Sequence, residues 1–220
     1  MARQGFLLQM YEAMYDTLGP SSWWPGHSAL EVCLGAILTQ NTNWANVEKA
    51  LENLKKKELL HADRLLQLSQ EELAELIRPA GYFRIKAARV QNFLQFLRQE
   101  VDLDVLALAR EDLQVLRPKI LTINGIGPET ADSILLYALH QPVFVVDAYT
   151  QRILSRHALI PEEVSYQELQ DFFMDALPRD VGLYNEFHAL LVRTGKNWCK
   201  KKQAKCGECP LQSFLEHSWA

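Results

Sequence analysis

The chain has 220 residues, of which 48% are hydrophobic, and a formal net charge of −4. That is enough apolar material for a buried core, and no run of about 18 apolar residues or signal-peptide-like start is present, so we expect a soluble, cytoplasmic protein, by default a monomer. The negative charge argues against a surface that coats nucleic acid broadly, although it leaves room for a focused DNA site.

Helical periodicity dominates the chain. Apolar residues recur at helical spacing over 30–38 and again over 90–97. Ser69 with Glu72, and Ser165 with Glu168, have the spacing of capping boxes at helix starts. Only residues 143–146 look strand-like, and they are too few to found a sheet. The sequence therefore predicts an all-α fold.

Tryptophans stand in two polar segments near the amino terminus. Trp23 and Trp24 precede Pro25, and Trp44 follows the polar stretch 40–43. Two interpretations stay open: the rings pack parts of the protein together, or they form a stacking slot for a planar ligand. Aromatic faces attract cations, so such a slot would suit a positively charged ligand.

Basic residues cluster at Arg84, Lys86 and Arg89, and again over 196–205. Each cluster is either a solvated helical face or a surface that contacts phosphates.

A glycine-rich turn lies between two apolar helical segments, at Asn124, Gly125, Ile126 and Gly127. Both glycines suit positive φ angles or the close approach of another chain. Pro128 fits the first turn of the following helix, whose free N–H groups and dipole favour a phosphate. The turn is either a helix-hairpin-helix that binds the DNA backbone or an ordinary connection between helices. Backbone contacts of this kind position a duplex without reading its sequence.

Asp147 follows an apolar stretch, 20 residues after Gly127. An aspartate at a helix start is an N-cap in the ordinary case. A carboxylate there can also stabilise developing positive charge or activate a water molecule. The two roles can coexist.

Three cysteines near the carboxyl terminus have the spacing Cys199-x6-Cys206-x2-Cys209, whereas Cys33 lies on an apolar helical face and is expected in the core. Disulfides are not expected in a cytoplasmic chain.

Together these motifs resemble the helix-hairpin-helix/Gly-Pro-Asp DNA glycosylases, the endonuclease III superfamily. Trp-Trp-Pro at 23–25, Leu-Thr-Gln-Asn-Thr at 38–42 and Arg-Pro-Ala-Gly-Tyr-Phe at 78–83 resemble its 3-methyladenine glycosylase subgroup. The resemblance implies a two-lobed fold with an interlobe cleft. A helical barrel would span residues 28–140, and residues 1–27 would join 141–220 in a second lobe.

The resemblance also implies a mechanism. Asp147 aligns with the catalytic aspartate of the superfamily. Bifunctional members carry a lysine two residues after the second hairpin glycine, where it forms a Schiff base that nicks the strand. Here that position is Glu129, and Lys119, which precedes the hairpin, is not an obvious substitute. We therefore expect a monofunctional glycosylase with little or no lyase activity.

The remaining site residues follow from the same resemblance. Gln40 would fill the gap left by the flipped base, and Tyr82 lies in the loop that wedges the opposite strand; alternatively, Gln40 caps its helix and Tyr82 anchors a turn. The predicted base pocket consists of Trp23, Trp24, Pro25, Trp44 and Glu129. The predicted DNA-binding residues are Gln40, Tyr82, Asn124, Gly125, Ile126, Gly127 and Thr130. The expected partner is double-stranded DNA that contains damaged bases.

The cysteine spacing is that of a [4Fe–4S] cluster in the superfamily, but the position of the fourth cysteine is Leu215. Three interpretations remain. A cluster is held by Cys199, Cys206 and Cys209 with water, a small molecule or His217 as the fourth ligand; the cysteines are a relic without metal; or a Cys3His zinc site forms.

Three functions compete at this point. The first is a monofunctional glycosylase of base-excision repair that removes alkylated purines such as 3-methyladenine. The second is an endonuclease III-like glycosylase for oxidised pyrimidines or mismatched bases, with or without lyase activity. The third is a non-catalytic DNA-binding module that uses the hairpin alone.

Overall fold

The computed structural model describes residues 2–215, and these residues form helices with no strand. The predicted all-α fold is confirmed. Residues 143–146 are buried but extended without a strand partner in this part of the chain. The chain divides into two compact units: unit 1 joins the residues up to Trp23 with those from Pro142 onward, and unit 2 is Trp24–Gln141. Within residues 2–215, no helix is both long and apolar enough to span a bilayer.

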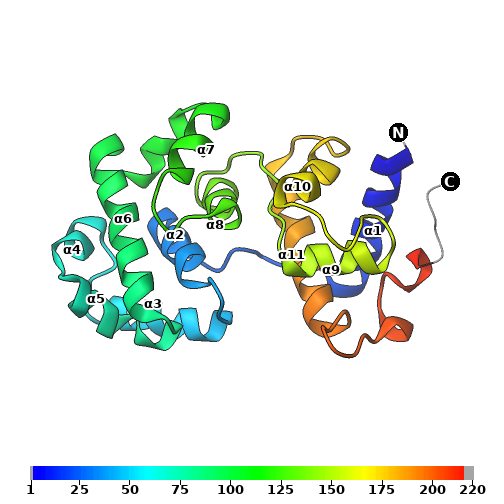
Figure 1. Ribbon diagram of the computed structural model, residues 1–220, viewed down its shortest axis with the longest axis horizontal. Helices are drawn as coiled ribbons and strands as arrows, with labels where there is room; N and C mark the ends of the chain where they lie inside the picture. The colour runs from blue at the N-terminus through cyan, green and yellow to red at the C-terminus, as the bar shows by residue number, and fades with distance from the viewer. Residues whose placement is uncertain (1, 216–220) are drawn as a thin grey trace. The chain divides into compact units, whose positions relative to one another are not determined.

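Unit 2 is built around α6 (Phe83–Val101), which packs against the shorter helices α2, α4 and α5 (Figure 1). The other elements of this unit are α2 (Ala29–Leu38), α3 (Trp44–Lys56), α4 (Ala62–Gln67), α5 (Gln70–Leu76), η1 (Arg78–Ala80), η2 (Val105–Arg110), α7 (Leu113–Leu121), α8 (Pro128–Ser133) and the π-helical turn η3 (Ile134–Ala138). Side-chain caps set several helix starts: Ser28 accepts from the N–H of Glu31, and Asn43 accepts from the N–H of Asn46.

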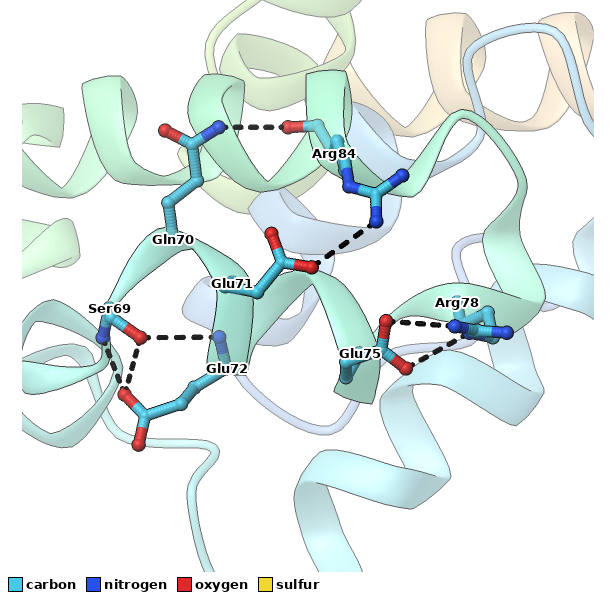
Figure 2. Close-up of polar contacts among 7 residues, drawn as sticks. All are labelled: Ser69, Gln70, Glu71, Glu72, Glu75, Arg78 and Arg84. Carbon is cyan, nitrogen blue, oxygen red and sulfur yellow. Dashed lines mark hydrogen bonds and ion pairs between the residues drawn. The ribbon is translucent and has the colours of Figure 1, made fainter.

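The capping box predicted at Ser69 begins α5, as Figure 2 shows. The Ser69 hydroxyl accepts from the N–H of Glu72, and the Glu72 carboxylate accepts from both the N–H and the hydroxyl of Ser69. Two exposed ion pairs lie beside it, Arg78 with Glu75 and Arg84 with Glu71, the latter joining α5 to α6. Exposed pairs of this kind contribute little to stability, so packing of the apolar faces holds this region together.

Unit 1 contains α1 (Ala2–Leu18), α9 (Ala148–Arg156), α10 (Tyr166–Met174), α11 (Val181–Asn197), η4 (Cys206–Glu208) and η5 (Gln212–Phe214). Its core is aromatic: the rings of Phe144 and Phe173 stack with centroids 4.1 Å apart, and Phe187 packs edge-on against both. The predicted capping box at Ser165 and Glu168 begins α10.

Helices α9 and α11 of unit 1 approach closely at a glycine. A Cβ on Gly195 would lie 2.5 Å from a ring carbon of Tyr149, a distance that no side chain tolerates. This contact brings the start of α9, where Asp147 stands, against α11.

Candidate functional site

The glycine turn of unit 2 joins α7 to α8, and its two glycines have different roles. Gly125 has a φ of +91°, and a Cβ there would lie 2.4 Å from Cγ of Arg89, so only glycine fits. Gly127 has an ordinary φ of −93°, and a Cβ would meet nothing within 4 Å. Gly127 therefore does not need glycine for a positive φ, because its conformation is one that any residue adopts. The close approach of another chain at Gly127 stays a prediction. Pro128 does occupy the first turn of α8, as predicted.

A buried ion pair fixes the angle between the two hairpin helices. Asp132 on α8 is fully buried, and Arg117 on α7 donates to both of its oxygens, at 2.7 and 3.0 Å. The bidentate geometry compensates the buried carboxylate and holds the turn between its helices.

Three side chains of α6 support the loops in which the predicted DNA-contacting residues lie. Lys86, Arg89 and Asn92, spaced three residues apart, lie along one side of the helix, and we refer to them as the α6 donor row. Lys86 is 1% exposed and donates to two carbonyls, those of Leu38 at 2.8 Å and Ala80 at 2.7 Å. Burial, with a smaller effect from Arg89, lowers the pKa of Lys86 to about 8.

The other two members of the α6 donor row reach the hairpin. Asn92 donates to the carbonyl of Asn124 at 3.0 Å, and Arg89 donates to the side-chain oxygen of Gln40. The amide nitrogen of Gln40 in turn donates to the Thr130 hydroxyl at 2.8 Å and to the Gly125 carbonyl at 3.2 Å.

Gln40 and Thr130 are held by hydrogen bonds, whereas Tyr82 is exposed. The Gln40 side chain bonds to the hairpin and to α6, so the alternative that it merely caps α2 is wrong. Thr130 is buried, and its hydroxyl is engaged by Gln40. Tyr82 is 69% exposed with a left-handed φ of 46°, immediately before α6, so its ring does not anchor the turn by burial. Ile126 is buried and Asn124 exposed.

Two of the three predicted pocket tryptophans lie together in unit 2. The rings of Trp24 and Trp44 meet edge to face, with centroids 5.2 Å apart. Trp24 also contacts Tyr137, with ring centroids 5.0 Å apart. Gly35 of α2 permits this, because a Cβ there would come within 3.1 to 3.2 Å of both indole rings. Both tryptophans are half-buried and Pro25 is exposed.

Trp23 belongs to unit 1, where the ammonium of Lys196 lies 5.9 Å from its ring centroid. The structure thus brings Trp24 and Trp44 together and places Trp23 in the other unit.

Asp147 caps α9 of unit 1 with one oxygen and faces a histidine with the other. Oδ1 accepts from the N–H groups of Tyr149 and Thr150 and from the Thr150 hydroxyl, at 2.8 to 3.0 Å. Oδ2 lies 3.6 Å from Nε2 of the buried His188 on α11. Burial by itself raises the pKa of the Asp147 carboxyl, but His188 and Thr150 outweigh that effect, so the pKa lies below its usual value. The carboxylate is therefore ionised at neutral pH.

The lysine position of the hairpin is exposed and acidic. Glu129 is the second residue of α8, and its carbonyl accepts from the Ser133 hydroxyl. Lys119 precedes the hairpin, and its ammonium pairs with Glu100 at 3.1 Å and Glu111 at 2.6 Å, which raise its pKa.

The three spaced cysteines of unit 1 line one small, partly open cavity. Arg156 donates to Sγ of Cys199 at 3.2 Å, and the pKa of Cys209 is raised by burial and also by the nearby Cys199 and Cys206. Cys33 is buried in the core of unit 2, as predicted.

Three thiols around one cavity fit an iron–sulfur cluster in the nature of their donor atoms, whereas Leu215, which also lines the cavity, has no ligating atom. Within residues 2–215, no three His, Cys, Asp or Glu side chains are gathered to bind a single metal ion. His217 lies outside the described residues.

The family model described as "HhH-GPD superfamily base excision DNA repair protein" matches residues 34–179, about two thirds of the chain. The chain belongs to the HhH-GPD superfamily. Membership supports DNA glycosylase activity as the general function and DNA as the partner. The matched segment includes the hairpin, Asp147 and the α6 donor row.

Relatives within the HhH-GPD superfamily cover nearly the whole chain. A protein of Methanocaldococcus jannaschii, provisionally named a DNA repair glycosylase, is 44% identical over 209 residues, which are 94% of each chain. The structure of Helicobacter pylori 3-methyladenine DNA glycosylase bound to 1,N6-ethenoadenine has a TM-score of 0.76 at 29% identity, covering 88% of this chain and 97% of that one. A trapped endonuclease III–DNA covalent intermediate shares the fold, with a TM-score of 0.82 at 21% identity, over 97% and 95% of the two chains.

Sequence reasoning missed the groups that support the predicted site residues. His188 lies on an apolar helix, and no motif signals its approach to Asp147, because the contact joins residues 41 positions apart. The bonds from Arg89 to Gln40 and from Asn92 to the hairpin also depend on tertiary packing. The one available signal was the spacing of basic residues on α6, which equally suits a solvated face.

Proposed function

We propose that the chain is a monofunctional DNA glycosylase of base-excision repair, which flips alkylated purines such as 3-methyladenine out of duplex DNA and removes them by hydrolysis. The monofunctional mode is inferred from Glu129, which stands in α8 where bifunctional members of the superfamily carry a lysine. A carboxylate cannot form the Schiff base on which lyase activity depends.

Two lysines of unit 2 are the obvious candidates to supply the missing amine, and neither is suited to it. Lys119 is held by two carboxylates and stays protonated. Lys86 has the lowered pKa that favours a nucleophilic amine, but it is 1% exposed and committed to two carbonyls. A sugar of the DNA backbone could not reach it without disruption of the fold.

The environment of Asp147 supports an electrostatic role in hydrolysis. Loss of the base leaves positive charge on the sugar, and an ionised carboxylate stabilises such charge. Because its pKa lies below the usual value, Asp147 is a weak proton acceptor, so charge stabilisation and orientation of water contribute more than proton abstraction. The cap bonds on Oδ1 leave Oδ2 as the oxygen for this work.

Trp24 and Trp44 support a cationic substrate. Their rings meet over Gly35 and leave half-buried aromatic surface, which attracts a positively charged N3-alkylated purine by about 2 kcal/mol when the site is desolvated. Such a base is also a good leaving group that needs little acid assistance. The likeness to the Helicobacter pylori enzyme, above 25% in identity, agrees with this substrate class.

The hairpin and the α6 donor row account for how DNA would be held. In this proposal the turn at Asn124, Gly125 and Gly127 contacts a phosphate, Gln40 fills the gap left by the flipped base, and Tyr82 wedges the opposite strand. The open space beside Gly127 supports the close approach of a DNA backbone there.

The test is base release from methylated duplex DNA, followed by chromatography, with strand breaks scored with and without alkali. We expect 3-methyladenine in the supernatant and nicks only after alkali. Asp147→Asn should abolish release while α9 stays folded, because asparagine caps helices nearly as well as aspartate. Borohydride should trap no covalent adduct with the wild type. Nicking without alkali, or a trapped adduct, would favour the endonuclease III-like function; no release with unchanged duplex binding would favour the non-catalytic module.

A further inference from the structure

The cysteine cavity of unit 1 contains two polar groups that glycosylase activity does not use. Besides the three thiols, it is lined by His157, at the end of α9, and by Thr194 of α11. Both side chains are buried, with exposures of 6% and 0%. Neither Nδ1 of His157 nor the Thr194 hydroxyl has a hydrogen-bond partner. Buried polar atoms are paired in nearly all cases, so these two point to a missing ligand.

His157 has the arrangement of a metal-binding histidine. Its ring makes a hydrogen bond to the backbone of Phe214, and because Nδ1 has no partner, the donor is Nε2–H. This bond fixes the tautomer in which Nδ1 carries a buried lone pair. Histidines that bind metals typically donate their other ring N–H to a carbonyl or carboxylate in this way.

The fourth cysteine position is the place where such a ligand is needed. Leu215 lines the same cavity but offers no donor atom, while Cys199, Cys206 and Cys209 supply three thiols. In a [4Fe–4S] cluster each protein ligand binds a different iron, so the four donors surround the cluster and do not converge on one ion. Imidazole replaces cysteine on iron in other iron–sulfur centres, so the substitution is chemically sound.

We propose that Nδ1 of His157 is the fourth protein ligand of a [4Fe–4S] cluster held by Cys199, Cys206 and Cys209. On binding, the three thiols lose their protons and the neutral imidazole loses none. The bound cluster therefore carries one negative charge fewer than with four thiolates. Arg156, which already donates to Sγ of Cys199 and to the carbonyls of Lys200 and Lys201, would hold the cysteine loop against α9.

The reduced charge has a measurable consequence. A cluster with three thiolates and one imidazole accepts an electron more readily than one with four thiolates, because the added electron meets less negative charge. We therefore expect His157→Cys to keep the cluster and to lower its reduction potential. His157→Ala should lose iron or retain a cluster with one iron fewer.

The experiment compares the full-length wild type with His157→Ala, His157→Cys and His217→Ala, all purified without oxygen after reconstitution with ferrous iron and sulfide. Iron and acid-labile sulfide are counted, and pulsed electron paramagnetic resonance of the reduced protein, labelled with 15N-histidine, detects any nitrogen bound to the cluster. We expect about four iron and four sulfide ions per chain in the wild type. The nitrogen signal should persist in His217→Ala and disappear in His157→Cys, which keeps its iron.

Three results would overturn the proposal. They are a wild type that binds no cluster, a nitrogen signal that survives in His157→Cys, and a signal lost in His217→Ala. His157→Cys keeps the test decisive if His157→Ala fails to fold. None of these readouts depends on base release, so the cluster proposal and the glycosylase proposal can fail separately.

Discussion

Lys86 gives unit 2 a stability that depends on pH in a calculable way. Its ammonium is 1% exposed, and burial lowers its pKa from 10.5 to about 8. That difference corresponds to a cost of about 3 kcal/mol for keeping the charged form in the folded chain. A neutral amine still has two N–H groups, enough for the carbonyls of Leu38 and Ala80.

The direction in which the free energy of unfolding changes with pH follows from proton linkage. Above about pH 10.5 the amine is neutral in both states and the cost is absent. As the pH falls toward about 8, the unfolded chain binds a proton that the folded chain does not, so the free energy of unfolding decreases. Between about pH 10 and about pH 8 the loss from this group is about 2 kcal/mol. Below about pH 8 the full cost persists.

Lys86→Met removes the titrating group and keeps the aliphatic chain. It also leaves two buried carbonyls without a donor, which lowers the free energy of unfolding by about 1–3 kcal/mol for each carbonyl. Urea unfolding followed by circular dichroism at constant ionic strength would give the difference in unfolding free energy between wild type and variant. That difference should grow in favour of the wild type by about 2 kcal/mol from about pH 8 to about pH 10. Lys49→Met, at a lysine exposed to solvent, is the matched control for the loss of one lysine. A difference that stays constant over this range would refute the argument from burial.

Three further predictions concern the hairpin and its supports. Gly125→Ala should destabilise the fold by more than about 1–2 kcal/mol, because Gly125 has a positive φ and an added Cβ would clash with Arg89. Gly127→Ala should leave the melting temperature unchanged but weaken duplex binding in a titration. Arg117→Met should lower the unfolding free energy by about 3–5 kcal/mol, because it leaves the buried carboxylate of Asp132 without its partner. If Arg117→Met and the double variant with Asp132→Leu prove equally unstable, the unpaired charge is not the cause. Arg89→Met should keep affinity for plain duplex while reducing preference for an abasic-site analogue several-fold; an equal loss on both DNAs would show a simple phosphate contact instead.

Local patterns in the sequence were enough for the helical class and for individual helix starts. The capping boxes at Ser69 and Ser165 and the proline start of α8 depend on residues within one turn of each other, and the structure confirms all three. Asp147 as a helix cap belongs to the same group, since its partners are two and three residues away.

What the sequence could not supply are contacts between distant segments. The bond from Gln40 to Thr130 spans 90 residues, and the approach of His188 to Asp147 spans 41. At Gly127 the motif suggested either a positive φ or the close approach of another chain. The φ is ordinary and the surroundings are open, so only the second expectation remains, as a prediction.

The α6 donor row affects how freely the segments that it contacts can change in sequence. Lys86 and Asn92 bond to main-chain oxygens at Leu38, Ala80 and Asn124, an acceptor that every amino acid provides. Lys86 and Asn92 therefore hold these three segments by their backbones, whichever side chains stand at the three acceptor positions. Exposed residues of these segments other than Gly125 and Gln40 could be exchanged while the scaffold stays intact, which makes this chain a suitable starting point for libraries that retarget a glycosylase to other lesions.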